Sequence, residues 1–345
     1  MVGQGSYGQV FRIQPGEVVK CSRNYNTICP RMLLREVAVL KHAAPGSPHL
    51  VQLTPAGSGR VQISANALCM RMEDGGSNMG DLLRYGRVAR HEVVPYLRQL
   101  LLGILHLHLN GILHCDIKPT NLLVKGGHLR LCDFGMAVPE KARPQDKHVQ
   151  TRWYRAPEVE LFQTPYDAYS FPIDAWSAGC ILGELLFSTY EQATSGRLAP
   201  MFPSGYSEHS AFSPSQGNDR LHLPLVIAVL RTVYHEHQLP VEALNDQWDS
   251  SVCLDALPQE ECAHTFTLRH APRPLVSQLL APLLLPWAEA RLTIAAALDQ
   301  LDQLEAPTEP RPSSPPAPEQ LQEWMGMSEE SAAQTLAQVV QQGLA

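Results

Sequence analysis

The segment from His114 to Asn121 constrains the possible fold and chemistry of this chain more than any other feature of its sequence. It reads His-Cys-Asp-Ile-Lys-Pro-Thr-Asn, so a carboxylate, an ammonium group and a carboxamide stand close together along the chain. Asp133-Phe134-Gly135 follows a short distance later, and Ala156-Pro157-Glu158 comes further on. Either aspartate alone is compatible with a solvated loop or a helix N-cap. The ordered set of motifs instead favours a reaction site.

A glycine-rich run opens the chain, where Gly3, Gly5 and Gly8 are followed by Val10. Alone, this pattern fits a dinucleotide fingerprint, a phosphate-binding loop or chance. A dinucleotide fingerprint needs a strand before it and a helix after it, whereas here only two residues precede Gly3 and an extended run follows Gly8. The pattern favours a strand–turn–strand loop whose backbone N–H groups cover phosphates. A Walker A loop is excluded because the sequence contains no Gly-Lys pair.

Length and composition limit the classes of protein to which this chain can belong. A chain of 345 residues, with 44% hydrophobic and 18% charged residues, is typical of globular proteins, and its length suggests about two domains. The net charge of −7 argues against nonspecific binding of nucleic acid or anionic membranes. No apolar run is long enough to span a membrane, and the first residues lack the features of a signal peptide. We therefore expect no nucleic-acid or membrane partner.

The eight cysteines are scattered, and no two of them have C-x-x-C spacing. A zinc site or a redox motif consequently has little support. Scattered single cysteines favour buried thiols in a reducing compartment. We expect an intracellular protein, of the cytoplasm, the nucleus or both, and no basic import cluster narrows that choice.

The N-terminal part of the sequence predicts strands around one helix. Residues 9–13 alternate in hydropathy, a turn follows at 14–16, and residues 17–20 return as a second strand. Apolar residues then recur at helical spacing over 31–43, until Pro45-Gly46-Ser47-Pro48 ends the pattern. Two more extended runs are expected near 50–54 and 67–72.

The rest of the chain predicts mainly helices. A wide apolar stripe begins near residue 91 and ends where Gly111 stands at the position of a C′ glycine. Polar residues over 189–220 predict an insertion loop, and the prolines over 307–318 predict a stiff linker. Further helices are expected over 173–188, 221–234 and 320–343.

Taken in order, the glycine loop, H-x-D-x-K-P-x-N, D-F-G and A-P-E resemble the motifs of the eukaryotic protein kinases. The resemblance runs from about Gly3 to about Leu298, which is most of the chain. It implies an α+β fold in which a small β-rich lobe with one main helix packs on a larger helical lobe. The parts it predicts are a kinase domain at 1–302, divided into an N-lobe at 1–73, a hinge at 73–80 and a C-lobe at 81–302, then a Pro-rich linker at 303–319 and a helical tail at 320–345.

The same resemblance implies ATP and Mg²⁺ as cofactors and protein hydroxyls as acceptors. Asp116 would accept the proton of the substrate hydroxyl, and Lys118 would contact the transferred phosphate. Asn121 and Asp133 would ligate Mg²⁺, because oxygen ligands suit that hard cation. Phosphoryl transfer needs such groups because its catalysis is mainly positioning and neutralisation of charge.

Lys20 resembles the strand lysine that grips the α- and β-phosphates, and Glu36 resembles its ion-pair partner on the helix. Met72 would be the gatekeeper beside adenine, and the backbone of Glu73 and Gly75 would bind that ring. Val18 stands where the family usually has alanine. The remaining residues that the resemblance assigns to nucleotide binding are Val2, Gly3, Gln4, Gly5, Ser6, Tyr7, Gly8, Val10 and Leu123.

The run Thr151-Arg152-Trp153-Tyr154-Arg155 before Ala-Pro-Glu resembles the CMGC group, which contains the cyclin-dependent and mitogen-activated kinases. In that group the arginine equivalent to Arg155 satisfies a strained carbonyl, which leaves no acceptor for an N–H after the phosphorylated residue. Proline has no N–H, so this arrangement favours Ser/Thr-Pro substrates. Thr151 and Arg155 are therefore assigned to substrate binding.

Two departures concern activation. Cys115 replaces the usual arginine of the catalytic loop, and Asp146 stands where cyclin-dependent kinases carry an activating phosphothreonine. We expect that activity does not depend on phosphorylation at that site. The helix before Glu36, over 24–34, lacks the cyclin-contact signature, so an activating cyclin-like subunit is left open.

The leading hypothesis is an active Ser/Thr protein kinase, and the alternative is a pseudokinase or scaffold that binds partners through this fold. Cys115 and Val18 favour the alternative slightly, whereas the complete set of motif residues opposes it. The C-terminal segment 320–343 is a docking element, a simple surface helix or a disordered tail. Three further residues are expected to be structural: Asp174 would bond the catalytic loop, and Glu158 would pair with Arg291.

Overall fold

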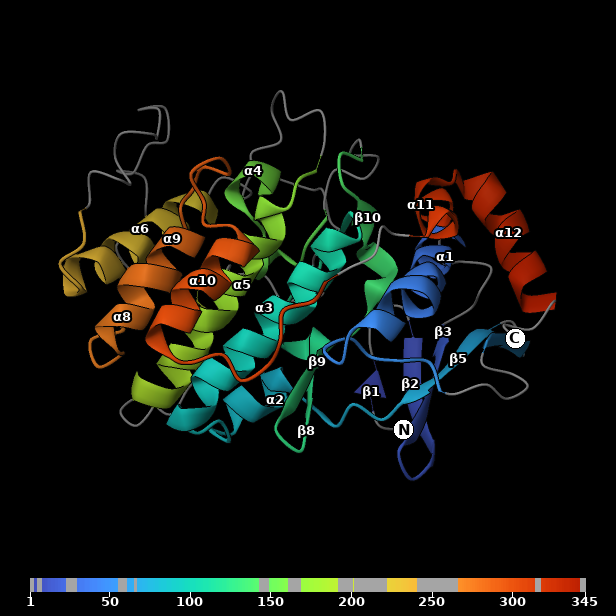
Figure 1. Ribbon diagram of the computed structural model, residues 1–345, viewed down its shortest axis with the longest axis horizontal. Coiled ribbons are helices and arrows are strands. Elements are labelled where there is room, and N and C mark those ends of the chain that lie inside the picture. The colour runs from blue at the N-terminus through green and yellow to red at the C-terminus, as the bar shows by residue number, and fades with distance from the viewer. Residues whose placement is uncertain are drawn as a thin grey trace.

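The chain folds into an N-terminal sheet, a larger helical region and a C-terminal helix pair that returns to the N-terminal part (Figure 1). This computed structural model confirms the predicted bilobal α+β fold. It describes residues 3–4, 8–22, 30–54, 61–64, 67–142, 149–160, 169–191, 201, 222–240, 266–313 and 318–341.

The N-terminal sheet is antiparallel and has the strand order β1-β2-β3-β5-β4. Its strands are β1 (Gly3–Gln4), β2 (Gly8–Gln14), β3 (Glu17–Ser22), β4 (Val61–Ser64) and β5 (Ala67–Glu73). The expected hairpin and the strand near 67–72 are confirmed. The strand expected near 50–54 is wrong, because Leu50 and Leu53 form only isolated bridges, to Leu131 and Met72.

The hairpin of β2 and β3 places the first nucleotide-site residues. Gly8 lies so close to β3 that a Cβ atom there would be 2.7 Å from the carbonyl oxygen of Cys21. Val10 is paired with Lys20 across the hairpin, and Gly16 makes the turn with a φ of 84°. Glycine is required at both positions, for close approach at Gly8 and for the left-handed turn at Gly16.

The main helix in the described N-terminal part of the chain, α1 (Pro30–Ala38), continues through a π-helical turn at Val39–Ala43. The helix predicted over 31–43 is thereby confirmed. Leu34 and Val37 are fully buried, and Glu36 is almost fully buried. The helix thus contributes both to the core and to the site described below.

The helical region is built around α3 (Val93–Leu109), whose apolar face is buried as predicted. Gly111 follows it with a φ of 70°, which suits the expected C′ glycine. The helices expected over 173–188 and 221–234 are confirmed as α5 (Pro172–Leu186) and α6 (His222–Glu236). Besides α3, α5 and α6, the α-helices in the described part of this region are α2 (Met79–Arg84), α4 (Pro157–Glu160), α8 (Arg273–Leu275), α9 (Ala281–Leu283) and α10 (Ile294–Leu304).

Short strands between the helices position the polar motifs. The strands are β6 (Ser77–Asn78), β7 (Ile112–Leu113), β8 (Leu122–Lys125), β9 (His128–Leu131) and β10 (Val138–Pro139). The loop from His114 to Asn121 joins β7 to β8, and Asp133 follows β9 closely. In the described part of the chain, no helix combines the length and the apolarity that a membrane crossing requires.

A buried ion pair fixes the segment after the Ala-Pro-Glu motif. The guanidinium of Arg291 donates to both carboxylate oxygens of Glu158, at 2.6 and 2.8 Å. It also donates to the carbonyl of Pro172 at 2.8 Å. The predicted structural role of this pair is confirmed, and the additional hydrogen bonds satisfy a guanidinium that is fully buried.

The C-terminal tail forms two helices, α11 (Glu319–Gly326) and α12 (Glu329–Gln341), as the sequence predicts. Both helices pack against α1, and α11 also contacts β10 (Figure 1). Leu321, Trp324 and Leu336 are buried in that contact region. The tail is therefore part of the folded core around α1.

The cysteines depart from the expected pattern at one place. Cys21 of β3 and Cys69 of β5 are opposite each other in the sheet and form a disulfide. The expectation of separate thiols is wrong for this pair, because strand register brings together two residues that are far apart in sequence. Among the described residues, Cys115, Cys132 and Cys180 are free thiols, as expected.

Candidate active site

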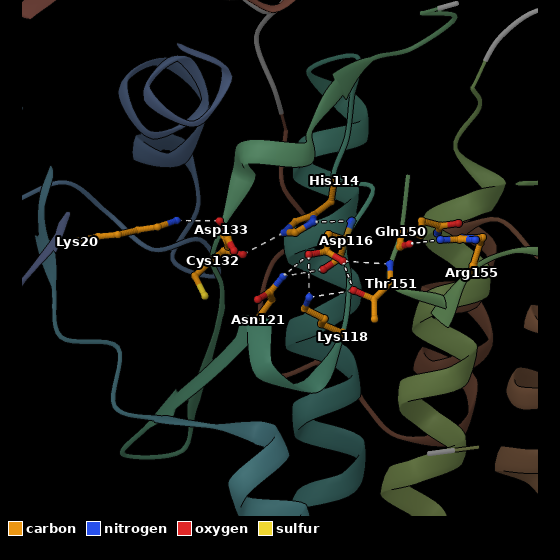
Figure 2. A network of polar contacts seen from close by, with 10 residues as sticks. All are labelled: Lys20, His114, Asp116, Lys118, Asn121, Cys132, Asp133, Gln150, Thr151 and Arg155. Atoms are coloured by element: carbon orange, nitrogen blue, oxygen red, sulfur yellow. Dashed lines mark hydrogen bonds and ion pairs between the residues drawn. The ribbon is translucent and has the colours of Figure 1, made fainter. Parts of the chain in front are cut away.

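The loop between β7 and β8 brings the side chains of Asp116, Lys118 and Asn121 together, and Thr151 joins them from a later segment (Figure 2). The chain makes sharp local turns at this place. Cys115 has a φ of 60° and Asp133 a φ of 68°, and non-glycine residues rarely adopt this left-handed region. Such backbone positions persist only where surrounding contacts hold them.

The carboxylate of Asp174 supplies those contacts for the catalytic loop. It accepts hydrogen bonds from the backbone N–H of His114 at 2.8 Å and of Cys115 at 3.0 Å. The ring of His108 lies 3.0 Å from the same carboxylate. Burial alone would raise the pKa of Asp174, but these hydrogen bonds and nearby histidines hold the pKa below its usual value. Its predicted structural role is confirmed.

Asp116 lies at the centre of the polar network, and its residue is only 9% exposed. Oδ1 accepts from the hydroxyl of Thr151 at 2.7 Å and from its backbone N–H at 3.2 Å. Oδ2 accepts from the amide of Asn121 at 3.1 Å and lies 3.1 Å from Nζ of Lys118. Lys118 also donates to the Thr151 hydroxyl at 2.9 Å. The carboxylate is therefore held in one orientation beside an ammonium group and a hydroxyl.

Lys20 lies between two carboxylates. Nζ is 2.5 Å from Oε1 of Glu36 and 2.7 Å from Oδ1 of Asp133, and Figure 2 shows it reaching toward Asp133. Burial alone would lower the pKa of Lys20, but the two carboxylates outweigh burial and raise it. Burial alone would raise the pKa of Asp133, but Lys20 outweighs burial and lowers it. The lysine and Asp133 are thus both held in their charged forms.

His114 is a positioning residue that the sequence analysis did not assign. Its Nδ1 accepts from the backbone N–H of Asp116 at 3.2 Å, so the ring proton is assigned to Nε2, which donates to the carbonyl of Cys132 at 3.2 Å. The ring also contacts Phe134, with the centroids 5.5 Å apart. One imidazole thereby links the Asp116 loop to the Asp133 segment.

The residues expected near adenine lie where β5 passes into β6. A Cβ atom on Gly75 would be 2.6 Å from the Leu123 side chain, so only glycine fits between this backbone and Leu123. The side chain of Glu73 accepts from the backbone of Gln52 and pairs with Arg130, at 3.1 Å each. That side chain is therefore engaged, and the backbone remains the part of Glu73 expected to bind a base.

The glycine loop is described only in part. Gly3 and Gln4 form β1 and pair with β2, and Gly8 and Val10 belong to β2. The expected nucleotide-site residues Val2, Gly5, Ser6 and Tyr7 lie outside the described residues, as does Asp146.

Thr151 and Arg155 are joined through Gln150, which the sequence analysis did not single out. Gln150 has a φ of 69°, and its carbonyl accepts from Arg155 at 3.0 Å. Arg155 also donates to the carbonyl of Val149 at 3.2 Å. No signal in the sequence marks Gln150, because its strained backbone becomes apparent only in the folded chain.

The donor atoms fit a divalent cation that is shared with phosphates. Among the described residues, no three or more His, Cys, Asp and Glu side chains cluster as a metal cage. The available protein donors are the Asp133 carboxylate and the Asn121 carbonyl oxygen, whose amide nitrogen already donates to Asp116. Mg²⁺ at nucleotide sites uses one or two carboxylates together with phosphate oxygens, and this limited donor set matches that requirement.

Comparisons with known proteins agree with this geometry. A sequence model described as "Protein kinase domain" matches residues 1–197. Cyclin-dependent kinase 20 of Homo sapiens is 35% identical over 201 residues, which are 54% of this chain and 55% of the relative. Cyclin-dependent kinase F-3 of Oryza sativa subsp. japonica is 34% identical, over 59% of this chain and 45% of the relative. MAPK/MAK/MRK overlapping kinase of Mus musculus is 32% identical, over 59% of this chain and 46% of the relative.

These relatives confirm the predicted resemblance to the CMGC group. The chain spans about half the length of the curated relatives it matches, with 55% of the human protein covered. The match of the sequence model ends at residue 197.

Proposed function

Because this chain belongs to the protein kinase domain family, we propose that it transfers the γ-phosphoryl group of Mg-ATP to Ser and Thr hydroxyls of protein substrates. One observation carries the proposal. The Asp116 carboxylate already accepts a hydrogen bond from a threonine hydroxyl, that of Thr151, at 2.7 Å. The ammonium of Lys118 lies beside both groups. A substrate hydroxyl that donates to the same carboxylate beside Thr151 would be oriented by a base and lie near a cation that stabilises anionic oxygen.

In the proposed reaction, each of a few side chains has a separate role. Asp116 would accept the hydroxyl proton as the oxygen bonds to the γ-phosphorus and the bond from that phosphorus to the β,γ-bridging oxygen breaks, which releases ADP. Lys118 would neutralise charge on the transferred phosphoryl group. Lys20, held by Glu36, would position the α- and β-phosphates.

Asn121 and Asp133 would hold Mg²⁺. When bound there, the cation would supply neutralisation of charge on the phosphate oxygens. The contact of Lys20 with Asp133 supports this assignment, because it shows the Asp133 carboxylate ionised and paired with a positive charge, here the Lys20 ammonium.

Substitution of Asp116 by Asn tests the proposal. The change keeps the size of the side chain and removes the base, so we expect the rate of phosphate transfer to fall by about 10²–10⁴-fold. The measurement is Mg-ATP-dependent phosphorylation of a degenerate Ser/Thr peptide library. The exposed Asp299→Asn is the matched control and should stay within about twofold of the wild type, since exposed changes away from a site have small effects.

Two results would count against this assignment. Transfer by Asp116→Asn at the wild-type rate would mean that Asp116 is not the base. A wild-type chain that binds ATP and transfers no phosphate to any library member would instead support the pseudokinase or scaffold alternative.

We further propose that the substrate residue after the acceptor is proline. Gln150 is held in a left-handed conformation and its carbonyl is already satisfied by Arg155, so a substrate N–H would find no acceptor there. An unpaired N–H costs about 1–3 kcal/mol, which predicts a preference of roughly 5- to 150-fold for Ser-Pro over Ser-Ala in kcat/KM. A peptide pair that differs only at this position measures it, and equal kcat/KM values would contradict it.

A further inference from the structure

The C-terminal helices α11 and α12 cover a face of α1 that the site does not use. The apolar side chains of the two helices point into this contact and are buried, and they belong to the same continuous core as α1. The buried side chains are those of Leu321, Trp324, Met325, Ala332, Leu336 and Val339. Figure 1 shows the pair lying along α1 at the end of the molecule opposite α6 and α8.

Polar contacts fix the position of the pair relative to α1. Arg31 pairs with Glu329, at 3.3 Å from its Nε, and its backbone N–H donates to the same carboxylate. Arg35 donates to the carbonyl of Met325 at 3.3 Å. These contacts lie on successive turns of α1, so the helix is held along its length.

The helix is also held at the end of its π-helical extension. The ring of Trp324 meets His42 edge to face, with the centroids 5.2 Å apart. The ammonium of Lys41 lies 5.5 Å from the centroid of the same indole. Gln322 donates to the carbonyl of Asn110 at 2.8 Å, which ties α11 to the end of α3. The tail therefore bridges α1 and the helical region.

Because α1 carries Glu36, anything that positions α1 also positions the partner of Lys20. We propose that the helix pair Glu319–Gln341 is an activating element built into the chain, which holds α1 so that Glu36 reaches Lys20. The Lys20–Glu36 ion pair is formed while the two helices are docked. Their contacts fall on α1 and its π-helical extension, on β4, on β10 and on the end of α3. Both observations favour activation over inhibition.

This inference rests on the proposed kinase function and specifies its regulation. A separate activating subunit that approached the same face of α1 would have to displace α11 and α12. The tail thus supports α1 from within the same chain, which is the role that a separate cyclin-like subunit would otherwise have. The docking role considered for the C-terminal segment is therefore docking on its own chain.

The test uses the full-length chain with two acidic substitutions in the tail. Leu321→Asp with Leu336→Asp places two carboxylates in fully buried positions, which the docked state cannot accommodate. Gln320→Asp with Gln338→Asp adds the same charge to the exposed faces of the same helices. We expect the buried pair to lower kcat/KM at least tenfold and to speed hydrogen exchange in α1, and the exposed pair to remain within twofold of the wild type.

Retention of wild-type kcat/KM by the Leu321→Asp, Leu336→Asp chain would overturn the inference. A second series guards against general unfolding of that variant. Arg31→Glu and Glu329→Arg should each lower kcat/KM three- to tenfold, and the two changes together should recover at least half of that loss. Full activity of both single variants would also overturn the inference.

Failure of the proposed kinase function can be distinguished from failure of the clamp, which is the proposed hold of the helix pair Glu319–Gln341 on α1. If the wild-type chain transfers no phosphate, the proposed function fails and the clamp is judged on hydrogen exchange alone. Faster exchange of the amides of α1 in the Leu321→Asp, Leu336→Asp chain, with unchanged exchange in the Gln320→Asp, Gln338→Asp chain, would then support the clamp. Equal exchange in all three chains would overturn it.

Discussion

The hydroxyl of Thr151 connects the two charged groups on which the proposed reaction depends. It donates to Asp116 at 2.7 Å and accepts from Lys118 at 2.9 Å. Hydrogen bonds to charged groups contribute about 1.5–3 kcal/mol. Loss of this hydroxyl would leave both groups less well oriented without removing either of them.

We therefore expect Thr151→Val to lower kcat by roughly 10–100-fold, which is the rate equivalent of about 1.5–3 kcal/mol. Thr151→Ser retains the hydroxyl and should remain within a few-fold of the wild type. Steady-state kinetics with one peptide substrate measure both variants. A Thr151→Val enzyme as fast as the Thr151→Ser enzyme would show that the hydroxyl has no part in orienting Asp116.

The residues that the sequence identified are those whose side-chain chemistry is distinctive. Asp116, Lys118 and Asp133 stand in ordered motifs, and the fold brings them into one polar network with Lys20. His114 is in the same motif, yet its bridging role depends on which atoms face its two ring nitrogens. That information arises from folding and is absent from residue spacing.

Among the helices and strands, those that follow from local sequence patterns were predicted, and those that depend on long-range pairing were not. The hairpin of β2 and β3 follows from alternation and a Gly turn, and α1 and α3 follow from helical periodicity. The segment at 50–54 has the hydropathy of a strand and lacks a continuous partner. The sequence analysis did not predict β4, because the pairing of this strand with β5 becomes apparent only in the folded sheet.

The disulfide between β3 and β5 is the clearest case of a feature set by register. Cys21 and Cys69 are separated by 48 residues in sequence and face each other in the sheet. In the chain-entropy account, such a cross-link stabilises mainly by restricting the unfolded chain, by about 2–4 kcal/mol.

Reduction of this bond should therefore lower the free energy of unfolding by about 2–4 kcal/mol. Urea unfolding with and without dithiothreitol measures the difference in the wild type. In the Cys21→Ser, Cys69→Ser chain the reductant should have no effect, which separates this bond from the other cysteines. A wild-type unfolding midpoint that reductant does not shift would contradict the prediction.

At the scale of the whole molecule, the C-terminal segment connects the two regions of the fold. Arg98 of α3 donates to the carbonyl of Glu305 at 2.7 Å, directly after α10. Glu309 then pairs with His49 at 2.7 Å. From there the chain continues to α11 and α12 on α1. The sequence predicted a stiff linker and helices here, but it contained no information about which surface the helices would cover.

This path places buried histidines at the junction of the two regions. His49 pairs with Glu309, and His106 approaches the carbonyl of Ala43 at 3.0 Å. Burial lowers the pKa of His49 even though Glu309 opposes that effect. Burial likewise lowers the pKa of His106. Both rings are therefore favoured in their neutral forms in the folded chain.

Acidification below neutral pH should for this reason destabilise the fold. Below about pH 6.5 an unfolded histidine binds a proton, whereas His49 and His106 in the folded chain remain neutral until the pH reaches their lowered pKa values. The unfolded state then binds more protons, so the free energy of unfolding falls as the pH is lowered through this interval and levels off below it. Urea unfolding between pH 7.5 and 5 measures the slope, and His106→Gln should reduce it. A free energy of unfolding that rises on acidification over this range would show that these histidines are charged in the folded protein.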